Sequence, residues 1–391
     1  MVTTVYNMIR DFLLPYAAHY RGRGWLVDAL AQPDDTYAQC TPAFDRAWEI
    51  DWSRHPSELR DLSGKLRALR TIVERERYDL VHVHTPIAGL VTRFALRRLR
   101  ATGVPRVVYT AHGFHFQPSG SRARNAAYLA AEKAAGRWTD ELIVINSADE
   151  AAARRYRLVP AERLVRMPGI GIDTEHFDPA RVLAEDIARV RAELGLGAAD
   201  QLVLMIAEFT TNKRPADAVH ALARLGRRDV HLAIAGRDGP ALAPTRRLIA
   251  SLGLDDRVHI LGFRRDVPAL IRASTTTLLL SAREGLPRSV LESLSLGTPV
   301  VGTRIRGVTD LLADGGGQLV AVGDLAGATD AIRRYVEHPE EARAAGERGR
   351  STVGAYDVRR VMAMHDELYD RALLRPAAAG SRGGRQKPDS W

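Results

Sequence analysis

The chain has 391 residues, which is enough for two domains that each bury a core. Hydrophobic residues make up 46% and charged residues 26%, and no apolar stretch approaches the roughly 20 residues that a membrane span needs, which excludes an integral membrane protein. The net charge of +9 favours an anionic partner, and the single cysteine, Cys40, excludes an intramolecular disulfide.

The first half of the chain alternates strand-like apolar runs with amphipathic helical stretches. Residues 2–6 resemble the end of a strand whose beginning is missing, so either the start codon is misplaced or the first sheet begins abruptly. A helix is expected to start near Phe12. Periodicity predicts further strands at 80–84, 106–110 and 142–145, and helices at 57–76, 87–101 and 122–136.

Three stretches of the chain are basic. Residues 93–100 and 121–133 are predicted helices that interleave arginines with apolar residues, and such helices can lie on an anionic membrane surface. A solvated helix face explains them equally well, so both interpretations stay open. The tail, 374–391, has a composition that cannot form a core and is expected to be disordered. Because the N-terminus lacks a signal sequence, we expect a cytoplasmic protein, with peripheral association at the inner face of the plasma membrane as an option.

A loop with two histidines follows the predicted strand at 106–110. In the string Tyr109-Thr-Ala-His-Gly-Phe-His-Phe116, the glycine lets the backbone approach a ligand closely. His112 could polarise a phosphate or a sugar hydroxyl, because the pKa of a histidine lies near neutrality. The alternative is a pair of histidines that only support the loop.

The second half repeats the alternation after a segment rich in glycine and proline. Residues 167–179 form the expected linker, and a helix is predicted at 182–194. Further strands are predicted at 202–206, 230–235, 259–261, 277–280 and 299–301, and a last helix at 358–373. Two such series predict an α/β fold with two doubly wound domains, over 1–170 and 171–355, and a ligand in the cleft between them.

Charged residues and glycine turns follow the strands of the second half. Lys213 comes shortly after the first of these strands and could supply a point charge to a diphosphate, while Asn212 could cap the next helix. The turn at Gly236 and the loop that contains Arg264 follow the next two strands and are candidates for nucleotide contacts. A solvated lysine and ordinary glycine turns are the alternatives.

The most informative segment reads Ser281-Ala-Arg-Glu-Gly-Leu-Pro-Arg-Ser-Val-Leu-Glu292. Gly285 and Pro287 predict a turn after a buried strand, so Glu284 lies in the turn and Glu292 inside the following helix. Such a turn presents free backbone N–H groups and the positive end of the helix dipole to a phosphate. Two carboxylates beside it can accept hydrogen bonds from sugar hydroxyls, which favours a nucleotide-sugar site over a solvated surface helix.

This segment resembles the signature of family 4 glycosyltransferases, and it is similar to that of bacterial capsular and exopolysaccharide enzymes. The family is retaining and has the GT-B fold, in which two Rossmann-like domains face a central cleft and a last helix, here 356–373, crosses back to the first domain. The resemblance implies that Glu284 contacts the donor sugar and that Glu292 binds the ribose. It places four more residues against the donor: Gly285, Leu286, Pro287 and, near the nucleoside, Leu291.

The resemblance also implies roles outside the signature. His112 matches a histidine that lies against the donor sugar, and Lys213 matches a lysine that binds the diphosphate. The family's arginine five residues before that lysine is replaced by Glu208, so the role of the arginine does not transfer. Gly236 and Arg264 lie in turns that resemble those facing the nucleotide.

The implied function is transfer of a hexose or N-acetylhexosamine from a nucleotide-sugar, in the first instance a UDP-sugar, to a lipid-linked or polysaccharide acceptor. The sequence contains no Asp-x-Asp motif, zinc-ligand spacing or Gly-x-x-x-x-Gly-Lys loop, so we expect no metal, no resident cofactor and no nucleic-acid partner. In the family, the acceptor attacks from the face that the diphosphate leaves. A non-hydrolysing nucleotide-sugar epimerase, a natural-product glycosyltransferase and an inactive nucleotide-sugar-binding subunit are the alternatives.

Overall fold

The computed structural model describes residues 1–52, 62–116 and 120–375. Within them the chain divides into two compact units. The first unit contains residues 1–144, 150–166 and the chain from 362 onward, and the second contains 145–149 and 167–361. The main crossing from the first unit to the second therefore lies at residues 166 and 167, where the glycine- and proline-rich segment begins.

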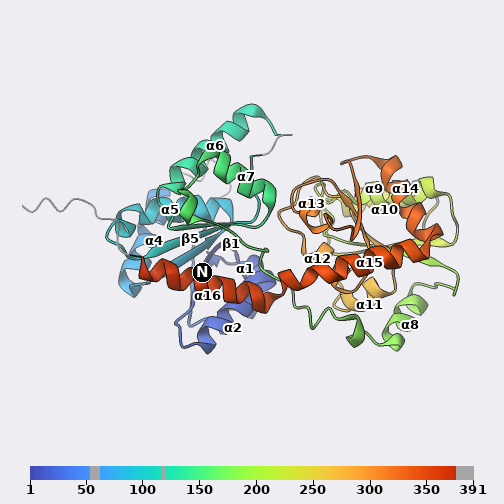
Figure 1. The fold of residues 1–391 in the computed structure, drawn as a ribbon, viewed down its shortest axis with the longest axis horizontal. Helices are drawn as coiled ribbons and strands as arrows, with labels where there is room; N and C mark the ends of the chain where they lie inside the picture. Colours follow the sequence, from blue (N-terminus) through green and yellow to red (C-terminus); the bar gives the residue numbers. More distant parts are fainter. Residues whose placement is uncertain (53–61, 117–119, 376–391) are drawn as a thin grey trace, which may run out of the picture. The chain divides into compact units, whose positions relative to one another are not determined.

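The first unit is built on a parallel sheet of seven strands in the order β3-β2-β1-β4-β5-β6-β7. The order reverses between β1 and β4, so the connections leave the sheet in opposite directions at that point, as in a doubly wound fold. Figure 1 shows the strands with helices packed around them. The strands are β1 (Val2–Val5), β2 (Asp28–Gln32), β3 (Arg46–Glu49), β4 (Leu80–His84), β5 (Arg106–Ala111), β6 (Glu141–Val144) and β7 (Leu164–Arg166).

The helices of the first unit cover this sheet with apolar side chains. Leu69 and Val73 of α4 and Leu96 of α5 belong to one buried cluster with Val83 and Val107 of the central strands. The helical segments are α1 (Tyr6–Met8), a π-helical turn (Ile9–Leu13), α2 (Leu14–Gly22), α3 (Tyr37–Cys40), α4 (Leu62–Glu76), α5 (Pro86–Arg100), α6 (Arg122–Gly136), α7 (Ser147–Tyr156) and α16 (Val358–Leu374). Of these, α7 and α16 each contribute residues to both units.

The second unit has a parallel sheet of six strands in the order β10-β9-β8-β11-β12-β13. Here the order reverses between β8 and β11, and open α/β sheets bind ligands beyond the carboxyl ends of the two strands at such a point. The strands are β8 (Gln201–Ile206), β9 (Val230–Ala235), β10 (Val258–Gly262), β11 (Thr276–Leu279), β12 (Val300–Thr303) and β13 (Gly317–Val320).

Apolar helix faces bury both sides of this second sheet. Val219 and Leu222 of α9 pack with Ile332 of α14 on one side, and Val290 and Leu294 of α12 belong to the cluster on the other. The helices are α8 (Ala184–Glu193), α9 (Pro215–Leu225), α10 (Leu242–Ser251), α11 (Val267–Arg272), α12 (Arg288–Ser295), α13 (Val308–Leu311), α14 (Leu325–Glu337) and α15 (Pro339–Val353).

The predicted α/β, doubly wound architecture is confirmed in both halves, and the structure differs from the expectation in three respects. The first helix begins at Tyr6 directly after β1, because no glycine turn separates them, and not near Phe12. Four strands, β2, β3, β7 and β13, had not been predicted. The helix expected from residue 57 is seen from Leu62 onward, and its first residues, like most of the predicted tail, lie outside the described residues.

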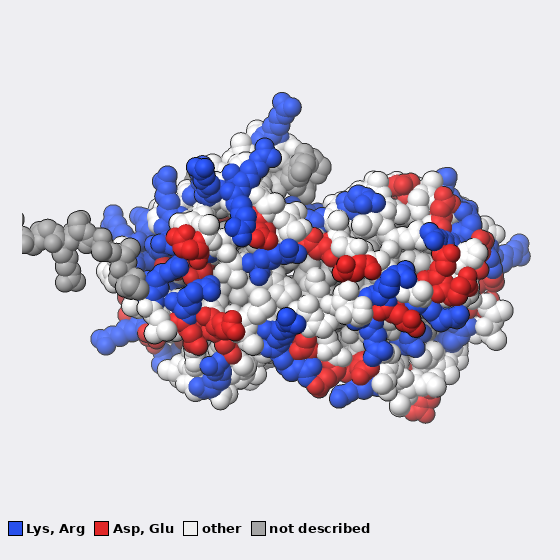
Figure 2. Space-filling model, viewed as in Figure 1, with Lys and Arg blue, Asp and Glu red and all other residues white. Residues whose placement is uncertain are grey.

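The basic helix predicted at 93–100 is only partly a charged surface. Arg93 is 1% exposed and pairs with Glu132 of α6 at 2.9 Å, and Arg100 pairs with Asp140 at 2.8 Å. Two of its cations are therefore internal ion pairs, which corrects the picture of a uniformly solvated basic face. Basic side chains still gather over the part of this unit that carries α5 and α6 (Figure 2). Among the described helices, none combines the length and the apolar character of a membrane span.

Candidate active site

An ion pair lies at the point where the strand order of the second sheet reverses. Lys213 follows β8 and Glu284 follows β11, and their side chains meet with 2.6 Å between Nζ and Oε1. The two strands are hydrogen-bonded neighbours, so the loops after their carboxyl ends must lie side by side. Both side chains are largely shielded, which strengthens their attraction relative to a solvated pair. The structure thus brings together the two residues predicted for the diphosphate and the sugar.

Asn212 connects the loop after β8 to the loop after β11 through hydrogen bonds. Its side-chain amide donates to the carbonyl of Arg283 at 2.9 Å, and its own carbonyl accepts from the N–H of Ala282 at 2.8 Å. The expectation that Asn212 caps the next helix is wrong, because the residue before α9 is Arg214 and no side chain caps that helix. Asn212 instead sets the distance between the loops that carry Lys213 and Glu284.

The amino end of α12 faces the same edge of the sheet. Pro287 precedes the helix and makes no capping hydrogen bond with its side chain, because proline has no side-chain acceptor. Gly285 and Leu286 lead into this end, and a methyl group added at Gly307 would stand 2.0 Å from the carbonyl oxygen of Gly285. The positive end of a helix without a side-chain cap, together with a lysine, is an arrangement suited to an anion.

Glu292 lies in α12, and its side chain is 13% exposed. Burial raises the pKa of its carboxyl, and Arg288, with Nη2 3.6 Å from Oε1, opposes this shift. A carboxylate in such a place can accept hydrogen bonds from paired hydroxyls. Its neighbour Leu291 is 2% exposed and packs in the apolar cluster with Val290 and Leu294. Leu291 therefore belongs to the apolar core of the second unit, and its expected contact with the nucleoside stays a prediction.

The remaining residues predicted for the donor have structural partners. At Gly236, an added methyl group would stand 1.9 Å from the carbonyl oxygen of Ala207, so this glycine permits close packing of the loop after β8. Arg264 is held between two carboxylates, Asp266 at 2.7 Å and Glu193. The hydrogen bonds that the guanidinium of Arg264 donates to these carboxylates raise its pKa and engage it within the protein. Glu208 is exposed.

In the first unit, His112 lies just beyond the carboxyl end of β5. Its Nε2 is 3.0 Å from Nδ1 of His84, the last residue of the adjacent strand β4. Burial lowers the pKa of His112 to about 4, so its imidazole is neutral at physiological pH. His115, expected to support this loop, packs its ring 5.3 Å from that of Tyr128. His112 and the pair Lys213–Glu284 thus belong to different units.

Several residues of the site had escaped the sequence analysis because their partners are distant in the chain. Asn146 donates from Nδ2 to the carbonyl of Gly285 at 3.2 Å, and to Asp149 at 2.8 Å. Asp149 in turn pairs with Arg306 at 2.6 Å. In the first unit, Thr85 follows His84 with φ of 67°, a conformation that costs a β-branched residue energy and that clusters at functional turns.

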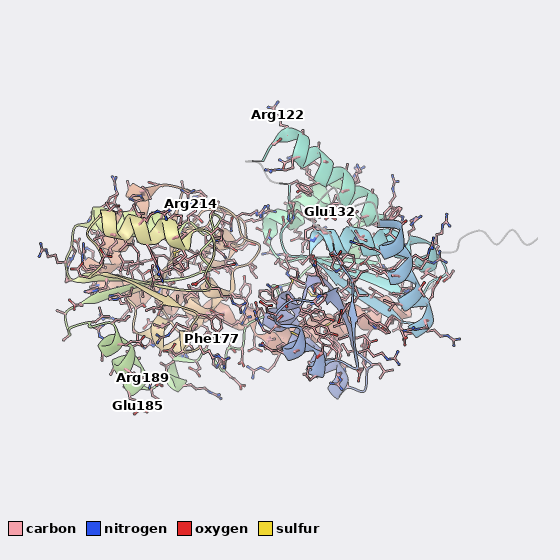
Figure 3. All side chains as sticks on the ribbon, turned by 180° about the vertical axis from the view of Figure 1, so that it is seen from behind. Arg122, Glu132, Phe177, Glu185, Arg189 and Arg214 are labelled. Atoms are coloured by element: carbon pink, nitrogen blue, oxygen red, sulfur yellow. The ribbon has the colours of Figure 1, made fainter. Side chains whose placement is uncertain are left out.

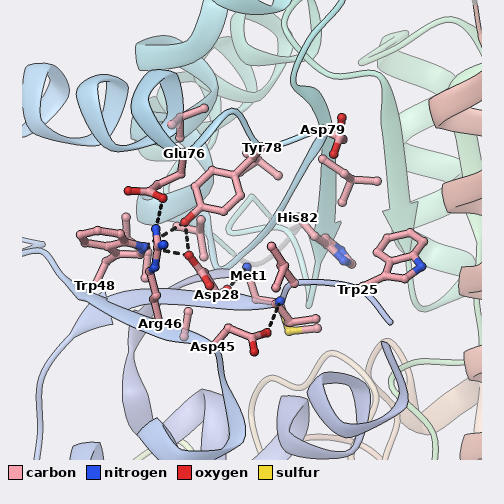
Figure 4. A pocket seen from close by; sticks show the side chains of 18 of the residues that line it. Met1, Trp25, Asp28, Asp45, Arg46, Trp48, Glu76, Tyr78, Asp79 and His82 are labelled. Atoms are coloured by element: carbon pink, nitrogen blue, oxygen red, sulfur yellow. Dashed lines mark hydrogen bonds and ion pairs between the residues drawn. The ribbon is translucent and has the colours of Figure 1, made fainter. Parts of the chain in front are cut away.

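A cavity of about 910 Å³ in the first unit lies at the opposite, amino edge of its sheet (Figure 4). Its polar groups bond to one another: Trp48 Nε1 donates to Asp28 at 3.1 Å and to the hydroxyl of Tyr78 at 2.9 Å, and Arg46 pairs with Glu76. These hydrogen bonds and this ion pair engage the polar side chains named here with one another, so they are not free to bind a diphosphate. Among the described residues, no group of three or more His, Cys, Asp and Glu side chains is arranged to hold a metal ion.

Comparison with known proteins gives two adjoining family matches. Residues 186–352 match the family described as glycosyl transferases group 1, and residues 9–169 match the glycosyl transferase 4-like domain. EpsD of Bacillus subtilis (strain 168), named as a glycosyltransferase, is 30% identical, and the match covers 94% of each chain. The Escherichia coli UDP-Gal:alpha-D-GlcNAc-diphosphoundecaprenol alpha-1,3-galactosyltransferase is 27% identical over 73% of both chains. The structure of Anabaena HepE in complex with UDP is similar with a TM-score of 0.78 at 21% identity, over 95% of this chain and 99% of that one.

Proposed function

The chain belongs to the group 1 glycosyl transferases of the family 4 type, enzymes with the GT-B fold that use nucleotide-sugars, and from this premise we propose that it transfers a hexose or N-acetylhexosamine from a UDP-sugar to a lipid-linked or polysaccharide acceptor, with retention of configuration. The role would be synthesis of a cell-surface glycan. Membership of this family favours transfer over the alternatives of an epimerase or an inactive binding subunit.

The contact between Lys213 and Glu284 carries the proposal for the donor. Lys213 offers a mobile cation beside the uncapped start of α12, so a diphosphate placed there would meet both the ammonium and backbone N–H groups. Glu284 would then accept hydrogen bonds from hydroxyls of the sugar. Glu292, about one turn after the start of α12, would bind the ribose. That HepE was crystallised with UDP supports a uridine nucleotide as the first donor to test.

The proposed reaction breaks the bond between C1 of the sugar and the diphosphate and forms a bond between C1 and the acceptor oxygen on the same face. The proton of the acceptor hydroxyl passes to the leaving diphosphate. Lys213 and the N-terminus of α12 stabilise the charge that develops on this diphosphate, which is the task that a metal ion performs in other transferases. Glu284 positions the sugar and is not the nucleophile. We therefore propose that the enzyme needs no metal.

The proposal for the acceptor has its support in a relative and in the charge of the first unit. The E. coli relative is named for a substrate in which the sugar is attached to diphosphoundecaprenol. An acceptor of this kind is anchored in a membrane, and the first unit carries exposed basic side chains on α6 that suit an anionic membrane surface. A natural-product glycosyltransferase would instead act on a soluble acceptor.

Turnover of a panel of nucleotide-sugars tests the proposal. The assay combines each donor, EDTA, and either a polyprenyl-diphosphate sugar or a soluble glycan acceptor, and it compares wild type with Lys213→Ala and Glu292→Ala. We expect product from a UDP-sugar in EDTA, a loss of about 100-fold or more in kcat for Lys213→Ala, and a raised KM for the donor in Glu292→Ala.

Two exposed residues of the second unit serve as matched controls. Arg247→Ala on α10 and Glu185→Ala on α8 remove the same charges away from the site, and we expect wild-type kinetics from both (Glu185 is labelled in Figure 3). Loss of product in EDTA that returns with a divalent ion would contradict metal independence. Sugar release or epimerisation without an acceptor would contradict transfer, and product on the soluble acceptor alone would contradict the lipid-linked acceptor.

A further inference from the structure

Three histidines form a row at the carboxyl edge of the first sheet. His82 and His84 alternate with Val83 along β4 and so point to the same face, where their ring centroids lie 4.1 Å apart. The ring of His84 also stacks on that of His112, with 5.3 Å between centroids and 28° between planes. Of these three rings, only that of His112 has an expected contact with the donor sugar, which the family resemblance implies.

His82 anchors the row. Its Nε2 lies 2.7 Å from the hydroxyl of Thr110, and its Nδ1 contacts the hydroxyl of Tyr369 on α16. Both nitrogens of His82 are therefore engaged, and its ring cannot rotate without losing a hydrogen bond in a buried place. The ring of His84 packs against this fixed ring.

His84 makes its single hydrogen bond to His112. The ring of His84 is 2% exposed, and burial lowers the pKa of both imidazoles, so both are neutral and each carries one N–H. The 3.0 Å contact between His84 Nδ1 and His112 Nε2 then needs a donor on one side and a lone pair on the other. The other nitrogen of His84, Nε2, is buried and has no hydrogen-bond partner among the described residues.

The unpartnered nitrogen decides which way the hydrogen bond runs. If His112 donated, His84 would carry its proton on Nε2, and a buried N–H group would have no acceptor. If His84 donates, only a lone pair is left without a partner. Buried N–H groups without acceptors are rarer in proteins than acceptors without donors. The second arrangement is therefore favoured, and it leaves the proton of His112 on Nδ1.

We propose that His84 is a positioning residue, which donates from Nδ1 to Nε2 of His112 and so fixes His112 as a neutral donor through Nδ1–H. Resting on the proposed function, this means that His112 gives a hydrogen bond to an oxygen of the donor sugar and does not act as a general base. Thr85, the residue after His84, supports a functional place for this turn, because its strained backbone sets where β4 ends.

Nuclear magnetic resonance of protein labelled with ¹⁵N-histidine tests the tautomer without any need for activity. The expected result at pH 7 is that His112 has a protonated Nδ1 and a bare Nε2, and that His84 has the same form. Replacing His84 by leucine should release His112 into a mixture of both tautomers, while His84→Asn, which keeps an N–H near the δ position, should preserve the Nδ1–H form. A protonated Nε2 on His112 in wild type would overturn the proposal.

A double-mutant cycle tests the consequence for turnover. We expect His84→Leu to lower kcat about tenfold with little change in the KM of the acceptor, His84→Asn to recover most of the loss, and His84→Leu to have no further effect in a His112→Leu background. A purely structural role predicts an equal loss in both backgrounds, which would contradict the proposal.

His112→Asn should retain more activity than His112→Gln, since only asparagine keeps a donor at the δ position. If wild type turns over no donor, the proposed function fails while the tautomer result still decides this inference.

Discussion

Arg93 illustrates how its surroundings decide what a charged residue does. Its guanidinium is buried, pairs with Glu132, donates to the carbonyl of Gly89 at 2.8 Å, and lies 3.9 Å from the ring centre of Tyr109. Glu132 also accepts from the hydroxyl of Tyr109 at 3.2 Å. This network connects α5, α6 and β5, so Arg93 stabilises the unit and is not available to a lipid or a substrate.

Replacing Arg93 by methionine should therefore destabilise the first unit. The change leaves the Glu132 carboxylate without its partner in a largely buried place, and breaking such a pair costs about 3 to 5 kcal/mol. Urea unfolding followed by circular dichroism measures the loss. Arg98→Met, on the exposed side of the same helix, should change stability by less than about 0.5 kcal/mol. Adding Glu132→Leu to Arg93→Met should recover part of the stability, and a further loss would contradict the explanation.

The residues of the site divide into those that the sequence could reveal and those that it could not. Glu284 and Lys213 were predicted because each lies in a motif with a recognisable strand before it. Asn146 and His84 were missed, since their roles depend on partners 139 and 28 residues away in the chain. Local spacing carries no information about such contacts. The pairing of Arg264 with Glu193, 71 residues away, could not be read from the sequence either, and the contact of Arg264 with the donor stays a prediction.

At the scale of elements, the loop between β11 and α12 is shaped by glycines on neighbouring segments. Gly307 has φ of 74° and lies against the carbonyl of Gly285, and Gly169 packs against the side chain of Leu286. A side chain at Gly307 would need the signature loop to move, because the obstructing atoms are backbone. These glycines therefore act on the geometry of the site without touching a ligand.

Gly307→Ala should lower turnover, and Gly226→Ala is its matched control. Both glycines have positive φ, so either alanine should cost about 1 kcal/mol in backbone strain. Only at Gly307 would the new methyl group collide with the loop, since nothing lies within 4 Å of that position at Gly226. We expect a loss on the order of 100-fold in kcat/KM for Gly307→Ala and none for Gly226→Ala. Equal kinetics in the two variants would show that the loop tolerates the displacement.

Elements that were predicted correctly share a strong periodic signal, and those that were missed lack one. β4, β9 and β11 are runs of buried apolar or β-branched residues in the middle of their sheets. β3 is an edge strand with the sequence Arg-Ala-Trp-Glu, and none of its residues is fully buried. β2 is short and built on alanines, which favour helices in isolation. Their strand conformation comes from the pairing of β2 with β1 and of β3 with β2, tertiary interactions that sequence periodicity does not report.

At the scale of the whole molecule, buried histidines link stability to pH. Burial lowers the pKa values of His82, His84 and His112 below the ordinary 6.5. The unfolded chain then binds protons from about pH 6.5 downward, while the folded chain resists them, so stability falls as the pH decreases through this range and is constant above it for these groups. For His112, whose pKa is about 4, the free energy of unfolding decreases by about 3 kcal/mol near pH 4. This value is an upper limit, because His112 is only partly buried and solvent weakens the effect.

Thermal unfolding between pH 4 and pH 8 measures this dependence. We expect the melting temperature to fall steadily below pH 6.5, and to fall less steeply in His84→Asn, which removes one of the three groups. The variant isolates the histidine contribution from that of carboxylates, which titrate in the lower part of the same range in both proteins. A wild-type curve that is flat between pH 6.5 and pH 5 would contradict the assignment of neutral buried imidazoles.

The last prediction concerns the surface of the first unit and the acceptor. The first turns of α6 are exposed, with Arg122 at the outer end of the helix (Figure 3) and Arg124 two residues further along. Tyr128, four residues and so about one turn after Arg124, is 37% exposed. Cations with an adjacent aromatic ring are suited to the interface of an anionic membrane. We therefore expect the protein to sediment with phosphatidylglycerol vesicles, and not with phosphatidylcholine vesicles, in low salt.

Each basic residue near such a surface contributes about 1 kcal/mol, so replacing both Arg122 and Arg124 by alanine should weaken vesicle binding roughly 30-fold. Replacing Arg246 and Arg247, two exposed arginines of α10 in the second unit, changes the net charge equally and should leave binding near wild type. If both pairs weaken binding alike, the attraction follows net charge and not α6. If wild type does not bind, the acceptor must reach the enzyme without help from this surface, and the soluble acceptors become the first to test.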